Sequence, residues 1–185
     1  MNFEEKLNKG FELLREKEID YALDVARELQ KEDPESHEAH YLEALVMQQL
    51  NQYEEATKAI QKALEIEGDN AAYYNLRGNV RMQVEKLDEA EEDFDRAIEL
   101  NDTPAAHRNK VMLMLMTDRG QDAIPYLIKR IKESPQDPEN WILMGDMIKK
   151  GGQEDKARTY YEQALKIDPD NDYARRQLEE EGDVF

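Results

Sequence analysis

The sequence predicts an all-α protein built from consecutive helical hairpins. Alanine recurs at Ala22, Ala56, Ala90, Ala123 and Ala157, with steps of 34, 34, 33 and 34 residues. A second set of mostly small residues recurs at nearly the same interval, with steps of 34, 34, 34 and 33: Gly10, Ala44, Gly78, Met112 and Gly145. A period of this size indicates a repeat array, in which each structural unit buries its apolar face by stacking on the next.

Each unit is predicted to contain two helices. In the segment 138–171, apolar residues recur at helical spacing on both sides of the turn signal Lys149-Lys150-Gly151-Gly152. Small residues such as Gly145 on the first helix and Ala157 on the second let the two backbones approach closely. Asp168-Pro169 ends the second helix.

At these positions the chain resembles the tetratricopeptide repeat (TPR) family. The segment 138–171 carries the family motif best, with Trp141, Gly145, Ala157, Tyr161 and Pro169 at the expected places. The resemblance implies one right-handed α-solenoid domain over 1–185, with five helix-turn-helix repeats and a C-terminal capping helix at about 172–181. The expected repeats span about 3–36, 37–70, 71–104, 105–137 and 138–171.

The fourth repeat departs most from the pattern. It is one residue short, and counting from Met112 to Ala123 places the missing residue in the turn 117–120. Pro125 follows, and we expect it in the first turn of the second helix, where its missing N–H costs nothing.

Composition excludes several classes of function. The net charge of −18 opposes binding to nucleic acid and to anionic membranes. The longest strongly apolar run, 111–116, has six residues and is too short to span a bilayer. The chain has no cysteine and no apolar leader at its start, so we expect a soluble cytoplasmic protein or a soluble domain of a longer one.

Catalytic and metal sites are not indicated. His37 and His40 stand three residues apart, a spacing that can hold a metal, but packing is the preferred interpretation. No phosphate-binding loop or nucleophile constellation is present. We therefore expect no enzyme activity, no metal and no cofactor.

The resemblance implies a binding function, because in this family the first helix of each repeat lines a concave groove that takes a partner peptide. Carried over by register, the groove residues would be Phe11, Tyr41, Leu45, Asn75, Asn79, Met82, Asn109, Leu113, Met116 and Ile142. Within the apolar run, we expect Leu113 and Met116 to be exposed, and Val111, Met112 and Leu115 to be buried.

One known family activity does not fit. The clamp for acidic C-terminal carboxylates uses basic residues and asparagines at fixed places of three consecutive repeats. Here Asn79 matches the clamp, but Asn75 occupies the position of a clamp lysine and Lys110 that of a clamp asparagine. Glu139 and Leu143 occupy the two positions where the clamp has basic residues. The sequence therefore argues against this clamp.

The preferred function is a non-enzymatic interaction scaffold that binds a peptide or helix of a protein partner. The alternative is a self-assembling homo-oligomeric scaffold, and an accessory subunit of an enzyme is the weakest of the three interpretations.

Overall fold

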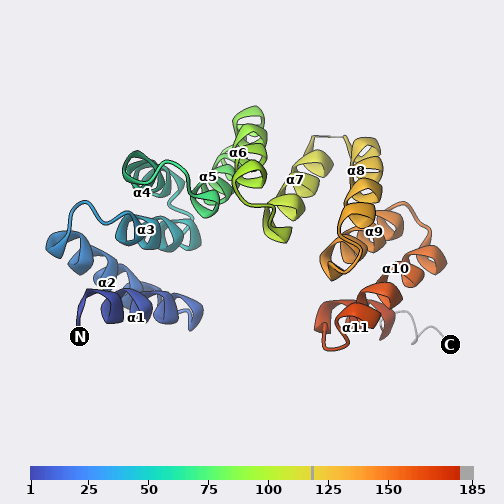
Figure 1. Cartoon of the computed structure of the whole chain (residues 1–185), viewed down its shortest axis with the longest axis horizontal. Helices are drawn as coiled ribbons and strands as arrows, with labels where there is room; N and C mark the ends of the chain where they lie inside the picture. Colours follow the sequence, from blue (N-terminus) through green and yellow to red (C-terminus); the bar gives the residue numbers. More distant parts are fainter. Residues whose placement is uncertain (118, 180–185) are drawn as a thin grey trace. The chain divides into compact units, whose positions relative to one another are not determined.

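The computed structural model describes residues 1–117 and 119–179. These residues form eleven helices and no strand, which confirms the predicted all-α fold class (Figure 1). In chain order the helices are α1 (Phe3–Arg15), α2 (Ile19–Glu32), α3 (His37–Gln49), α4 (Tyr53–Ile66), α5 (Ala71–Gln83), α6 (Leu87–Leu100), α7 (Pro104–Met116), α8 (Gly120–Glu133), α9 (Pro138–Lys150), α10 (Glu154–Ile167) and α11 (Asp172–Glu179).

The chain divides into two compact units, Met1–Asp102 and Thr103–Phe185. In the first unit α1 packs on α2, α3 on α4 and α5 on α6, and each hairpin contacts the next. In the second unit α7 packs on α8 and α9 on α10, and α11 packs on α10. Each unit has its own buried core.

Small residues on the first helix of a pair receive a ring from the second helix. Gly78 on α5 faces Phe94 on α6, and Gly145 on α9 faces Tyr161 on α10. Both rings are fully buried. The periodic alanines are buried as well, and Ala22, Ala56, Ala90, Ala123 and Ala157 have no exposed surface. The predicted close approach of the two backbones is therefore present.

Four of the first helices, α1, α3, α5 and α9, begin after residues whose side chains cap a free backbone N–H group, whereas Thr103 before α7 makes no such hydrogen bond. The Ser36 hydroxyl accepts from the amide of Ala39 at the start of α3, and the Asp137 carboxylate accepts from the amide of Glu139 at the start of α9. Pro104 and Pro138 occupy the first turns of α7 and α9, where a missing N–H is tolerated.

The helix bounds correct the predicted place of the missing residue. Three residues connect the two helices of every pair, and this holds for α7 and α8 as well. Four residues separate successive pairs, except that only 101–103 lie between α6 and α7. The shortened segment is thus the connection before α7, not the turn 117–120 that follows it.

This correction shifts the register of α7 by one residue. Val111, not Met112, takes the small-residue position of Gly78 and Gly145, and it is fully buried. Met112 is 44% exposed, so the expectation that Met112 is buried was wrong. Leu113 is fully buried, so the expectation that Leu113 is exposed was wrong too. Because the missing residue lies before α7, each position of the repeat pattern in α7 is occupied by the residue one number lower than predicted.

Pro125 also lies elsewhere than expected. α8 begins at Gly120, so Pro125 is its sixth residue and stands inside the helix, beyond the first turn. A proline there cannot donate a hydrogen bond to the carbonyl of Gln121.

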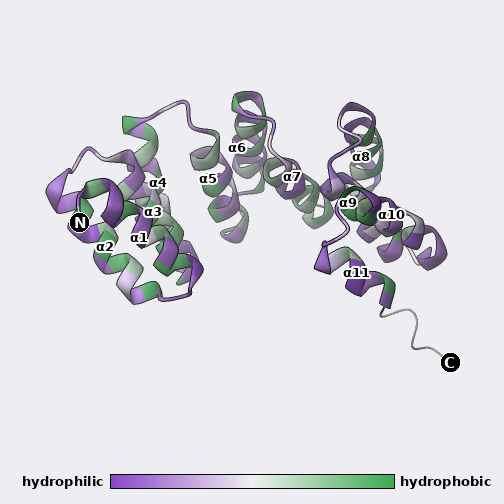
Figure 2. Ribbon diagram, turned by 60° about the horizontal axis from the view of Figure 1, so that its bottom comes forward, coloured by the Kyte–Doolittle hydropathy of each residue, from purple (hydrophilic) through white to green (hydrophobic). Residues whose placement is uncertain are grey.

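The last helix, α11, closes the second unit. Ala174 is buried and Leu178 packs against the core of the unit, as predicted for a capping helix. Most of α11 is hydrophilic, as Figure 2 shows. The last two residues of the predicted cap, 180 and 181, lie outside the described part of the chain.

Candidate functional site

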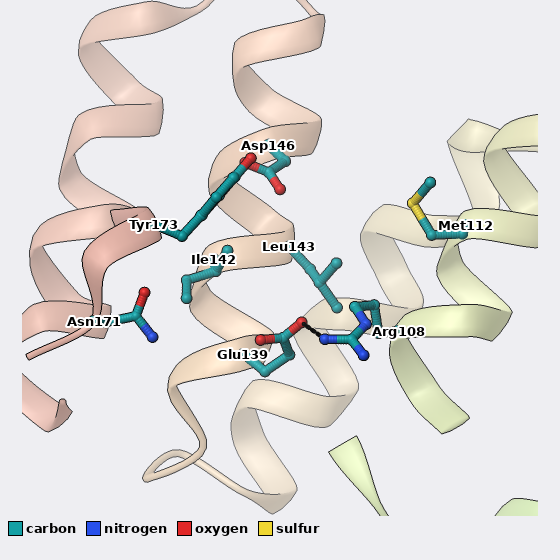
Figure 3. Close-up of a pocket in the computed structure, with 8 residues that line it drawn as sticks. All are labelled: Arg108, Met112, Glu139, Ile142, Leu143, Asp146, Asn171 and Tyr173. Atoms are coloured by element: carbon teal, nitrogen blue, oxygen red, sulfur yellow. Dashed lines mark hydrogen bonds and ion pairs between the residues drawn. The ribbon is translucent and has the colours of Figure 1, made fainter. Parts of the chain in front are cut away.

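A pocket of about 380 Å³ opens in the second unit on the side formed by its first helices and the cap. Figure 3 shows the residues that line it. They come from three helices and the turn before the last one: Arg108 and Met112 on α7; Glu139, Ile142, Leu143 and Asp146 on α9; and Asn171 and Tyr173 at the start of α11.

The floor of the pocket is apolar. Ile142 and Leu143 are each 5% exposed and belong to the core of the unit. Met112 and Tyr173, by contrast, are 44% and 42% exposed at the sides. Large apolar side chains left in solvent beside a hollow are the type of surface that binds a partner.

An ion pair spans two of the lining helices. The Arg108 guanidinium on α7 donates through Nη1 to Glu139 Oε1 on α9 at 3.0 Å (Figure 3). Arg108 is half exposed and Glu139 is about a quarter exposed. The pair therefore lies at the mouth of the pocket, where solvent still reaches it.

Asp146 forms the polar wall opposite this pair. Its Oδ1 accepts hydrogen bonds from the hydroxyls of Tyr161 at 2.7 Å and of Tyr173 at 3.0 Å. Burial raises the pKa of Asp146 above its ordinary value, while these two hydrogen bonds and the charge of Lys149 act in the opposite direction. The Lys149 ammonium donates to Gln177 Oε1 on α11 at 3.0 Å, so this hydrogen bond joins α9 to α11 as that of Tyr173 does.

The predicted groove residues of the second unit are only partly at this pocket. Ile142 lines it, whereas Asn109, Leu113 and Met116 do not. Met116 is 52% exposed, as expected, and Leu115 is partly buried, where full burial was expected. The corrected register explains why Met112 lines the pocket and Leu113 does not. The positions equivalent to Phe11, Leu45 and Asn79 in the last two repeats are Met112 and Asp146, at steps of 34, 34, 33 and 34.

Sequence analysis therefore missed Arg108, Met112, Glu139, Leu143, Asn171 and Tyr173 as members of one site. The signal for the first two was available, because Val111 lies 12 residues before Ala123, as Gly145 lies 12 before Ala157. The one-residue correction of the α7 register also means that Asn109, and not Lys110, occupies the position where the carboxylate clamp has an asparagine. Glu139 and Leu143 still stand at its basic places.

In the first unit, two predicted groove residues, Phe11 on α1 and Tyr41 on α3, form a row of aromatic rings with Tyr73 on α5. The ring centroids of Phe11 and Tyr41 are 6.2 Å apart, and those of Tyr41 and Tyr73 are 4.7 Å apart. Leu45, Asn75, Asn79 and Met82 are partly buried. Burial raises the pKa of both Tyr41 and Tyr73, so both phenols stay neutral over the physiological range.

The two histidines considered as metal ligands have other partners. His37 Nδ1 lies 2.7 Å from the Tyr73 hydroxyl, and His40 Nε2 lies 2.9 Å from the carbonyl oxygen of Pro34. Across residues 1–117 and 119–179, no group of three or more potential ligands converges on a metal position. None of the helices in those ranges is long and apolar enough to cross a bilayer.

Comparison with known proteins agrees with the fold. Tetratricopeptide repeat models match residues 13–80, 71–104 and 138–171. A curated relative, the protein O-mannosyl-transferase Tmtc3 of Drosophila melanogaster, is 36% identical over 112 residues. That alignment takes 60% of this chain but only 12% of the relative.

Two solved structures illustrate the structural similarity. TTC0263, a thermophilic TPR protein of Thermus thermophilus, has a TM-score of 0.79 at 17% identity, with 97% of this chain and 98% of that chain covered. YrrB, described as a TPR protein with an unusual peptide-binding site, has a TM-score of 0.60 at 22% identity, with 92% and 89% covered. With three family models matched along the sequence and helical hairpins in both units, the chain belongs to the tetratricopeptide repeat family.

Proposed function

We propose that this protein is a non-enzymatic interaction scaffold that binds a peptide or helix of a protein partner on the face formed by α7, α9 and α11. The observation that carries the proposal is the pocket on this face, in which a buried apolar floor lies between the exposed side chains of Met112 and Tyr173. An apolar side chain of a partner would displace water from this floor, and that burial drives association.

The known relatives support the same class of function. TPR domains mediate protein interactions, and YrrB, which shares the fold, is a TPR protein with a peptide-binding site of its own. The groove residues predicted for the first unit, including Phe11 and Tyr41, remain part of the proposal as a second contact surface.

The experiment is a peptide-display selection against the purified protein, followed by NMR mapping of one selected peptide. We expect amide chemical-shift changes to concentrate on α7, α9 and α11. Changes concentrated on α8 and α10 would show that the partner binds the second helices instead, which would overturn the proposal.

Self-association is the competing outcome and has its own measurement. Sedimentation velocity over a wide concentration range should show a monomer throughout. A dimer whose formation is abolished by Met112→Glu would assign the face to a second copy of the chain rather than to a different partner.

A further inference from the structure

The charges around the pocket of the second unit are not balanced. Glu139 is neutralised by Arg108, its ion-pair partner at 3.0 Å. Within the described part of the chain, Asp146 forms no ion pair, and it receives only hydroxyl donors at Oδ1. The pocket thus combines an apolar floor with one carboxylate whose charge has no cation in contact with it.

Partial burial disfavours the ionised form of the Asp146 carboxyl. Burial raises the pKa of Asp146, and this effect outweighs the two tyrosine hydrogen bonds and the charge of Lys149. A cation that entered the pocket would stabilise the ionised form in a partly desolvated place, where the attraction is less screened than in bulk water.

The geometry also distinguishes between kinds of cation. Oδ1 already accepts from Tyr161 and Tyr173, so its two acceptor positions are occupied. Among the residues that the structure describes, no hydrogen bond reaches the second oxygen, Oδ2. A guanidinium binds a carboxylate best through both oxygens, whereas an ammonium needs only one. The arrangement therefore favours an ammonium group.

We propose that this pocket receives a lysine side chain of the partner, with its ammonium on Asp146 Oδ2 and its aliphatic stem over Ile142, Leu143 and Met112. Lysine suits both parts of the site, because its four-carbon stem packs on apolar surface while its terminal ammonium stays polar. The inference deepens the proposed function, on which it rests, by naming the chemistry of the partner residue that enters the pocket.

The test uses three small probes of known composition, so it does not need the natural partner. Nα-acetyl-lysine methylamide, its norleucine analogue and its arginine analogue are titrated into isotope-labelled protein, and amide shifts of α7, α9 and α11 are followed. The norleucine probe has a similar stem without the ammonium. We expect it to bind about tenfold more weakly than the lysine probe, since one charge-assisted hydrogen bond is lost.

Two variants separate the role of Asp146 from general acidity. Asp146→Asn keeps a carbonyl oxygen for the two tyrosines but removes the charge, so lysine and norleucine probes should bind it equally. Asp155→Asn, which removes an exposed carboxylate on α10 outside this pocket, should keep the preference for lysine. A third variant, Tyr173→Phe, frees one acceptor position on Oδ1, so the preference for lysine over arginine should shrink.

The outcomes distinguish this inference from the proposed function. Equal binding of lysine and norleucine probes to the wild type would overturn the lysine assignment and leave peptide binding on this face intact. Stronger binding of arginine would overturn it as well. If no probe shifts these amides, the lysine pocket is rejected, and the display selection alone decides the proposed function.

Discussion

Gly145 on α9 lies directly against the ring of Tyr161 on α10. A Cβ atom added at Gly145 would stand 2.6 Å from Cε1 of that ring, and at Gly78 it would stand equally close to Phe94. Real Cβ atoms do not approach carbon so closely, so the absence of a side chain is a condition for closing the hairpin.

Gly145→Ala is therefore expected to destabilise the protein by about 1–3 kcal/mol, the usual cost of overpacking a well-packed site. The free energy of unfolding from urea denaturation checks this value. Gly120→Ala is the matched control, because an added Cβ there would meet only Leu115 and Met147 at 3.6 and 3.8 Å. Equal stability of the Gly145→Ala protein and the wild type would show that the ring can move aside.

Pro125→Ala is expected to stabilise the second unit. Pro125 is exposed and lies inside α8, where proline is disfavoured relative to alanine by up to about 3 kcal/mol. The gain should appear as a higher unfolding midpoint, while Lys129→Ala, an exposed change on the same helix, should have little effect. A lower midpoint for Pro125→Ala would mean that the proline stabilises a bend that the unit needs.

Stability should depend on pH through Asp146. Its pKa in the folded protein is raised above the ordinary value of 3.8, chiefly by burial. The folded state therefore holds this proton more tightly, so its contribution to stability is complete at low pH. It is lost as pH rises from the ordinary value through the raised pKa.

Comparison with Asp146→Asn isolates this contribution. The difference in free energy of unfolding between the variant and the wild type should move in favour of the variant as pH rises through that window, and then level off. A difference that does not change with pH would show that burial does not perturb this carboxyl.

The register of α7 can be tested by stability alone. Leu113 is fully buried, so Leu113→Glu forces a charge into the core of the unit and should cost more than about 3 kcal/mol. Met112→Glu, at a half-exposed position, should change stability by about 0.5 kcal/mol or less. The reversed order would restore the register in which Met112 is buried and Leu113 faces outward.

Most of the fold could be predicted from the sequence because hairpin packing imposes a strict period. Gly145 and Ala157 are fixed by contact between two helices, so their spacing repeats wherever a hairpin repeats. The residues of the candidate site were predicted less well, because the residue missing from the fourth repeat was placed after α7 instead of before it. Because of that one-residue shift, Leu113 was predicted to be exposed in place of Met112.

Other parts of the site lie outside what a repeat period can show. The hydrogen bonds from Tyr161 and Tyr173 to Asp146 join three helices, and no local pattern marks such a convergence. Tyr173 also belongs to the cap, where the sequence motif has ended. Pro125 was placed wrongly for a different reason, because the start of α8 was misjudged: Ala123 is the fourth residue of its helix, as Ala157 is of α10.

The binding of one selected peptide to three proteins tests the central claim most directly: wild type, Met112→Lys and Ile128→Lys. Met112 and Ile128 are both 44% exposed in the same unit, but only Met112 lines the pocket. We expect Met112→Lys to weaken binding by at least about tenfold, because an ammonium would replace an apolar contact and repel the lysine proposed to enter the pocket. Ile128→Lys should leave the affinity unchanged. If Met112→Lys binds as tightly as the wild type while Ile128→Lys loses affinity, the face formed by α7, α9 and α11 is not the binding site.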